Sequence, residues 1–112
     1  MSRNPRHRKP PAASLLFAAL GDDTRLALVG KLRSGEPHSI AELTAGSRLT
    51  RQAITKHLRV LAKAGIVRCS RAGRESHFAL QPESIAQMRT YLDEVSHQWD
   101  ETLDRLKMFV EA

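Results

Sequence analysis

Residues 50–65 read TRQAITKHLRVLAKAG, and this stretch decides the fold. Within it, the apolar side chains of Ile54, Leu58 and Leu61 recur at steps of four and three. Such steps place side chains on one face of an α-helix, where they can be buried together. The spacing therefore predicts a helix over Thr50–Ala64 with a buried apolar face and a polar outer face.

The segment before this helix has the signals of a helix-turn-helix. Ser39 and Glu42 stand three positions apart, as in a capping box, and predict the start of a short helix with Ile40 facing inward. Residues 46–49 begin with glycine and suit a turn, after which Thr50 is a favourable N-cap. A short helix, a turn and a second capped helix make up a helix-turn-helix pattern.

The rest of the chain completes a fold that is mainly α with a small β-hairpin, a winged helix-turn-helix. The other expected elements are helices at Ser14–Leu20 and from Asp22 or Asp23, strands at Ile66–Ser70 and Ser76–Leu80, and a long last helix from Pro82. We divide the chain into a flexible basic arm, residues 1–12, and a domain, residues 13–112. The arm is either an inert leader or an auxiliary contact to DNA phosphates.

Charge is divided along the chain rather than mixed. The 112 residues have a net charge of +6, which favours a polyanionic partner. Residues 43–74 hold eight arginines and lysines and no acid, whereas residues 82–112 hold seven acids and three basic residues. The basic segment contains the helix-turn-helix, so we expect that segment to contact double-stranded DNA.

The outer face of the 50–64 helix carries candidate base contacts. We predict this role for Arg51, Gln52 and Arg59, because arginine matches the edge of guanine and glutamine that of adenine. Each of them taken alone fits equally well as an ordinary exposed helix residue. As a set without an acid that follows a helix-turn-helix, they favour contact with DNA.

Other residues are expected to position the protein on the DNA backbone. Thr50, Thr55 and Lys56 suit phosphates near the helix N-terminus, and Arg71 and Arg74 suit the flanking backbone or minor groove from the hairpin tip. The full predicted DNA-binding set is Arg48, Thr50, Arg51, Gln52, Thr55, Lys56, His57, Arg59, Arg71 and Arg74. His57 adjoins the buried face, so we expect a structural histidine or a phosphate contact rather than catalysis or metal binding.

These segments resemble the ArsR-type (ArsR/SmtB) winged-helix repressors. The matching stretches are LGDDTR at 20–25, IAEL at 40–43, TRQAITKHLRVLAKAGIV at 50–67, and GRE at 73–75 followed by Phe78 and Leu80. The resemblance implies a homodimer built from the first and last helices, an inverted-repeat operator, and repression relieved by an inducer whose identity the sequence does not specify. Asp23 stands where that family often has proline, and Arg48 where glycine or proline is common.

The metal sites of that family are not matched here. Residues 40–44 offer no thiolate, and residues 93–95, DEV, break the Asp-x-His pair that begins the family's last-helix site. His97 has Asp93 and Glu101 one helical turn away, which we interpret as a solvated histidine–carboxylate pair rather than a ligand set. We therefore expect no metal, no cofactor and membership of a non-metal-sensing branch.

Cys69 is the only cysteine of the chain. No disulfide within the chain and no cysteine-based zinc site can form, which fits a cytoplasmic protein. Without a resolving partner, Cys69 is interpreted as a small buried thiol in a strand and not as a redox sensor.

The last helix has an apolar seam that a monomer cannot cover completely. Apolar residues recur at steps of three and four from Ile85 to Val110, close to a heptad pattern. Part of the seam is expected to fold onto its own core and the rest to form a homodimer interface. Pairing would set two DNA-reading helices about 34 Å apart, the spacing of successive major-groove faces. The predicted interface set is Leu15, Leu16, Phe17, Leu92, Val95, Trp99, Leu103 and Leu106.

The sequence therefore favours a sequence-specific, homodimeric transcriptional repressor. The alternative is a winged-helix module that binds protein or RNA, which would bind unrelated duplexes with equal affinity. An enzyme is not expected, because serine, histidine and acidic residues are scattered without a nucleophile elbow, a glycine loop or a ligand cluster. No apolar stretch is long enough to span a membrane.

Overall fold

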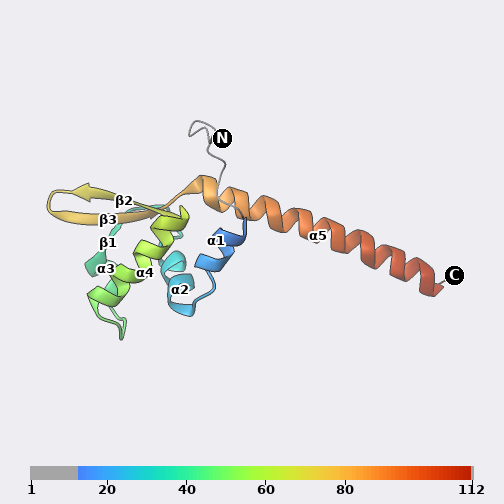
Figure 1. Ribbon diagram of the computed structural model, residues 1–112, viewed down its shortest axis with the longest axis horizontal. Coiled ribbons are helices and arrows are strands. Elements are labelled where there is room, and N and C mark those ends of the chain that lie inside the picture. Colours follow the sequence, from blue (N-terminus) through green and yellow to red (C-terminus); the bar gives the residue numbers. More distant parts are fainter. Residues whose placement is uncertain (1–12, 112) are drawn as a thin grey trace, which may run out of the picture.

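The computed structural model describes residues 13–111, and the predicted arm, residues 1–12, lies outside them (Figure 1). The elements in chain order are α1 (Ala13–Ala19), α2 (Asp23–Lys31), β1 (His38–Ser39), α3 (Ile40–Thr44), α4 (Arg51–Ala64), β2 (Val67–Ala72), β3 (Glu75–Leu80) and α5 (Pro82–Glu111). The predicted class, mainly α with a small β-hairpin, is confirmed. Among the described helices none is long and apolar enough to cross a membrane.

Both ends of α4 form as the sequence predicts. The Thr50 side chain accepts a hydrogen bond from the backbone N–H of Ala53 at 3.1 Å, which caps the first turn. Gly65 ends the helix with a φ of 87°, a left-handed conformation that favours glycine. The N–H groups of Gly65 and Ile66 then donate to the carbonyls of Ala62 and Leu61, respectively, which is the Schellman pattern.

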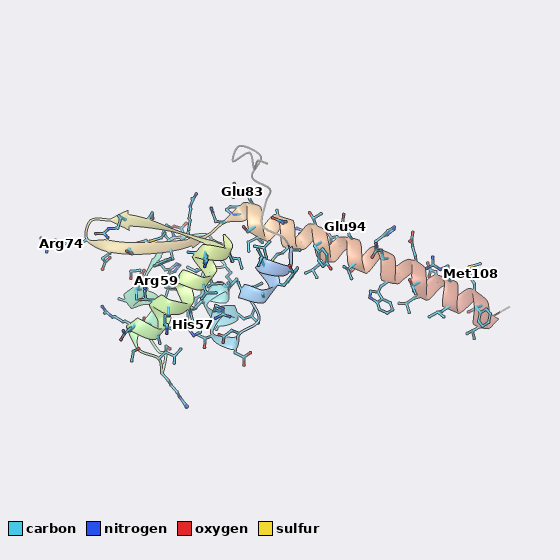
Figure 2. All side chains as sticks on the ribbon, viewed as in Figure 1. His57, Arg59, Arg74, Glu83, Glu94 and Met108 are labelled. Carbon is cyan, nitrogen blue, oxygen red and sulfur yellow. The ribbon has the colours of Figure 1, made fainter. Side chains whose placement is uncertain are left out.

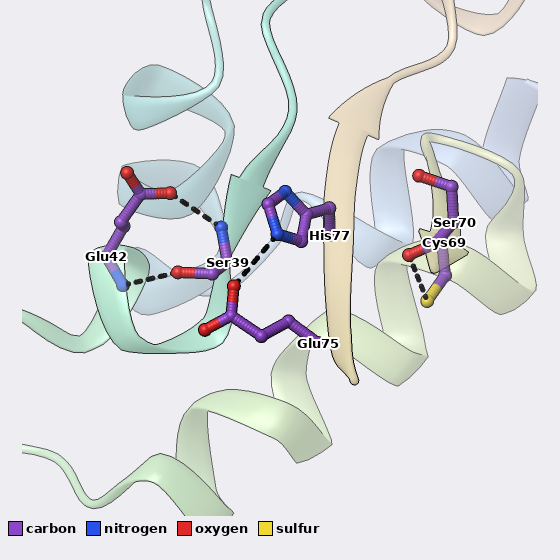
Figure 3. Close-up of polar contacts among 6 residues, drawn as sticks. All are labelled: Ser39, Glu42, Cys69, Ser70, Glu75 and His77. Carbon is purple, nitrogen blue, oxygen red and sulfur yellow. Dashed lines mark hydrogen bonds and ion pairs between the residues drawn. The ribbon is translucent and has the colours of Figure 1, made fainter. Parts of the chain in front are cut away.

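The capping box at the start of α3 is also confirmed (Figure 3). The Ser39 hydroxyl accepts from the backbone N–H of Glu42 at 3.1 Å, and the Glu42 carboxylate accepts from the backbone N–H of Ser39 at 2.8 Å. Two backbone donors at the helix start are thereby satisfied, so a helix of only five residues has a fixed entry point.

One core joins the helices to the base of the hairpin. Its fully buried members are Leu16, Leu28, Leu32, Leu43, Ile54, Leu58, Leu61, Ile66 and Val67. The predicted inward face of α4 is therefore confirmed. The placement of Leu16 in the dimer interface is wrong, because Leu16 is 0% exposed and lies with Ala19 on the buried face of α1.

The sheet is larger than predicted. β2 and β3 pair antiparallel as far as Ala72 and Glu75, so both strands extend beyond their predicted bounds and only a two-residue turn joins them. Gly73 makes this possible because it adopts a φ of 64° at the first turn position, as type II′ hairpin turns require. The short strand β1, which was not predicted, pairs with β3 and gives the order β1-β3-β2. Two residues are too few to show an alternating pattern in sequence.

Helix α5 starts against the body and then leaves it (Figure 1). Met88 is buried and Ile85 packs against the core, while Tyr91 meets Phe17 of α1 with ring centroids 5.7 Å apart. Ser84 is buried as well and donates a hydrogen bond to the carbonyl of Gly65. This bond ties the start of α5 to the end of α4.

Replacing Ser84 with alanine is expected to lower the free energy of unfolding by about 1–2 kcal/mol, because the Gly65 carbonyl loses its donor. Urea unfolding at a fixed protein concentration, followed by circular dichroism, measures the loss. Ser96→Ala is the matched control, since Ser96 is exposed on the same helix. Equal losses in the two variants would show that the Gly65 bond contributes nothing.

Candidate nucleic-acid interface

A shallow groove runs along the outer face of α4. It is lined by Thr50, Gln52, Ala53, Thr55, Lys56 and Arg59. Gln52, Lys56 and Arg59 are exposed, and they lie on the side of the helix opposite the buried stripe. Five of the ten predicted DNA contacts are thus brought together on one face: Thr50, Gln52, Thr55, Lys56 and Arg59.

The two threonines of this groove differ in what their hydroxyls can still do. The Thr55 hydroxyl donates its proton to the carbonyl of Arg51 at 2.7 Å. The Thr50 oxygen instead accepts from the Ala53 N–H, so its own proton remains available to a phosphate oxygen. Of the two, Thr50 is therefore better suited to the phosphate contact predicted for both.

The remaining predicted contacts lie around the groove. Arg51 is exposed in the first turn of α4, and Arg48 is exposed in the turn before it. Arg74 occupies the tip of the hairpin, well away from α4, and Arg71 is exposed on β2 (Figure 2). The predicted basic contacts thus come from three parts of the structure: the α3–α4 turn, α4 and the hairpin.

His57 does not line the groove but lies on the side of α4 that faces α2 (Figure 2). Its Nδ1 atom is 3.2 Å from Nη1 of Arg25 and 3.8 Å from Oδ2 of Asp22. Of the two roles predicted for it, the structural one fits this position. No role for Arg25 was predicted from the sequence. No residue spacing could have shown its contact with His57, because Arg25 and His57 are 32 positions apart in the chain.

Two carboxylates near the interface have lowered pKa values. The backbone N–H of Arg25 lowers the pKa of Asp22, and the charges of a protonated His57 and of Arg25 act in the same direction. The backbone N–H of Ser39 lowers the pKa of Glu42, helped by the Ser39 hydroxyl. Both carboxylates are helix caps, so their charged forms hold α2 and α3 in place.

A second surface, the α5 stripe, consists of the apolar side chains of α5 that its own core leaves uncovered. Its predicted members Leu92, Trp99, Leu103 and Leu106 are each more than half exposed, and Val95 is half-buried. On α1, Phe17 is half-buried, while Leu15 is 59% exposed and lines an apolar groove with Val60 and Ala64 of α4. At the far end of α5, Met108, Phe109 and Val110 are more exposed still.

The residues considered for sensing are all at the surface. His97 pairs with Glu101 at 3.3 Å, and both side chains are more than half exposed, as expected for a solvated pair. Cys69 was expected to be buried, but it is exposed, because β2 is an edge strand whose residues beyond Val67 face solvent. Within residues 13–111, no three histidine, cysteine or acidic side chains are grouped so that they could hold a metal ion.

Comparison with known proteins decides the family. A helix-turn-helix domain family matches residues 20–70. The HTH-type transcriptional regulator Rv2034 of Mycobacterium tuberculosis is 39% identical over 88 residues, 78% of either chain. A solved ArsR-like transcriptional regulator from Rhodococcus sp. RHA1 is 30% identical with a TM-score of 0.72, covering 87% of this chain and 91% of that one. The chain belongs to the ArsR family of winged helix-turn-helix transcriptional regulators.

A further relative, the HTH-type transcriptional repressor SmtB of M. tuberculosis, is 30% identical over 92 residues, 82% of this chain and 66% of the repressor. The ArsR-family protein described here is accordingly a DNA-binding transcriptional regulator and not an enzyme. In this regulator α3 and α4 form the helix-turn-helix, and the β2–β3 hairpin is the wing.

The variant Glu42→Gln is expected to weaken the acid-induced loss of stability. Because folding lowers the pKa of Glu42, its contribution to stability is present above the ordinary carboxyl range and is lost as the pH falls through the lowered value. Gln cannot titrate, so the variant is less stable near neutral pH and loses less stability on acidification. Urea unfolding from about pH 6 to about pH 3 measures both effects.

The control is Glu94→Gln, which removes a carboxylate from the middle of α5 (Figure 2). If the Glu42 and Glu94 variants follow the same pH curve as each other, the capping box does not account for the acid sensitivity.

Proposed function

We propose that this regulator is a homodimeric repressor that recognises an inverted-repeat operator through α4. The observation that carries the proposal is the groove on α4, where Gln52 and Arg59 stand beside phosphate-binding groups with no acid among the lining residues. Its neighbourhood is basic from residue 43 to residue 74. A solvated helix face that served no polyanion would mix both signs of charge.

Within this proposal, Arg51, Gln52 and Arg59 read base edges in the major groove, since guanidinium and amide groups pair with guanine and adenine. The backbone contacts fix the position of the helix along the duplex. We assign this role to Arg48, Thr50, Lys56, Arg71 and Arg74, with Arg71 and Arg74 reaching the flanking backbone or minor groove from the wing. Thr55, also predicted for this role, is not assigned it, because its hydroxyl donates to the Arg51 carbonyl.

The α5 stripe supports the homodimer. Trp99, Leu103 and Leu106 are more than half exposed on the part of α5 that projects beyond the body, and no other element within residues 13–111 covers them. Exposed apolar side chains grouped along one helix are typical of a protein–protein interface. A second copy offers the same stripe, so symmetric pairing covers both. We assign Leu15 and Phe17 of α1 to the same interface.

In this proposal, binding to the operator represses transcription. One relative, SmtB of M. tuberculosis, is named a transcriptional repressor, which supports repression rather than activation. We propose residues 13–112 as the unit that both binds DNA and dimerises. A winged-helix module for protein or RNA is the second candidate, and the experiments below separate the two. No residue of this chain is assigned to an inducer.

Replacing Gln52 with alanine is expected to cost about 1–3 kcal/mol on an operator selected from random duplexes, and to relax the preference at one base pair. Arg74→Ala should instead weaken binding to operator and scrambled duplexes alike, and reduce the salt dependence by about one unit per lost phosphate contact. Fluorescence anisotropy at several salt concentrations measures both variants.

The two variants serve as controls for each other, because both remove a polar side chain from an exposed position. Base readout by α4 is contradicted if operator and scrambled DNA respond identically to Gln52→Ala. Equal affinity of the unchanged protein for both duplexes favours the module for protein or RNA.

Trp99→Asp is expected to halve the sedimenting mass, because a charge placed in the α5 stripe cannot be buried against a second copy. Sedimentation velocity at a fixed concentration measures the mass. The matched control is Gln98→Asp, which adds the same charge beside the stripe in a polar part of α5. An unchanged mass in the Trp99 variant rules out this interface.

A further inference from the structure

Arg25 connects three helices at one point. Its Nε atom donates to the carbonyl of Ala19 at the end of α1, at 2.6 Å. Its Nη1 atom lies 3.2 Å from Nδ1 of His57 on α4, and its backbone N–H donates to the Asp22 side chain that caps α2. The guanidinium therefore ties the middle of the DNA-reading helix to the junction of α1 and α2.

The contact between Arg25 and His57 depends on the protonation state of the histidine. A guanidinium has only donors, so the 3.2 Å contact requires Nδ1 of His57 to accept, with the ring neutral and its proton on Nε2. A protonated ring has a proton on both nitrogens and cannot accept from Arg25. The nearby Oδ2 of Asp22, at 3.8 Å, is then the partner to which Nδ1 can donate.

Few other groups compete for this ring within residues 13–111. The charged groups shown to face it are Asp22, the N-cap of α2, and Arg25 in the first turn of α2. The Ala19 carbonyl of α1 is connected to the ring through Arg25. Its neighbours one turn away on α4 are apolar: Ala53, Ile54, Val60 and Leu61. Protonation therefore exchanges one α2 partner for another of opposite charge.

We propose that Arg25 and His57 are positioning residues of the DNA-reading helix, and that protonation of His57 moves its contact from Arg25 to Asp22 and weakens operator binding. His57 stands between Lys56 and Arg59, so a shift of the helix at this point moves both side chains against the DNA. This inference rests on the proposed operator-binding function.

The sharpest test uses His57→Gln, whose side-chain oxygen can accept from Arg25 but does not titrate. At about pH 7.5 this variant should bind the selected operator within about twofold of the unchanged protein. Between about pH 7.5 and pH 5.5 the unchanged protein should lose about tenfold more affinity than the variant, the factor that one hydrogen bond represents. Fluorescence anisotropy measures the affinities, and circular dichroism checks that both proteins stay folded.

Two further variants complete the comparison. His57→Leu removes the acceptor, and should lose about tenfold in affinity at pH 7.5. His97→Gln removes an exposed histidine of α5 that is remote from α4, and this variant should keep the pH profile of the unchanged protein. The proposal is overturned if His57→Gln keeps that pH profile as well.

A measurement without DNA separates this inference from the proposed function. The backbone amide shifts of α4, recorded by nuclear magnetic resonance, should follow the titration of the His57 ring and lose that dependence in His57→Gln. Amide shifts that ignore the His57 titration overturn the positioning role. Equal affinity for operator and scrambled duplexes at pH 7.5 contradicts the proposed function instead, and the amide titration then decides the inference alone.

Discussion

The left-handed backbone at Gly65 is the constraint on which the rest of the structure depends. It ends α4 and turns the chain so that Ile66 and Val67 enter the core at the base of the wing. Its carbonyl accepts from Ser84, and the Ile66 carbonyl accepts from the N–H of Gln81 at 2.8 Å. The end of the reading helix, the root of the wing and the start of α5 therefore meet at one glycine, and a residue with a Cβ would be strained there.

How much of the fold could be predicted depended on how far apart in the sequence the interacting residues lie. The bounds of α4, the Ser39 capping box and the stop at Gly65 depend on residues within one or two turns, and the sequence shows them directly. Strand β1 and the inward turn of Leu16 depend on neighbours far away in the chain. The groove residues of α4 were predictable because burial of one helix face fixes the other face. The Arg25 contact has no such local signal.

The division of charge gives the two surfaces different environments. Basic side chains cover the turn, α4 and the wing, while acids predominate along α5 from Glu83 to Glu111. A polyanion is attracted to the first surface and repelled from the second. The apolar positions of α5 are thereby kept away from nucleic acid and remain free to pair with surface of the same kind. Charge alone orients the molecule on a duplex before any specific contact forms.

Two contacts hold α4, the proposed DNA-reading helix. Each contact connects α4 to one of the helices, α1 and α5, that we propose form the dimer interface. Ser84 of α5 holds its C-terminal end, and Arg25 of α2 holds its middle to the end of α1. In a symmetric pair, the distance between two copies of α4 is then fixed by these contacts as much as by the interface itself. A base-reading side chain displaced by about 1 Å loses hydrogen-bond geometry. If these anchors position α4 as proposed, a signal that alters operator binding does not need to reach the DNA-facing groove, because a change at either anchor would move the groove as a whole.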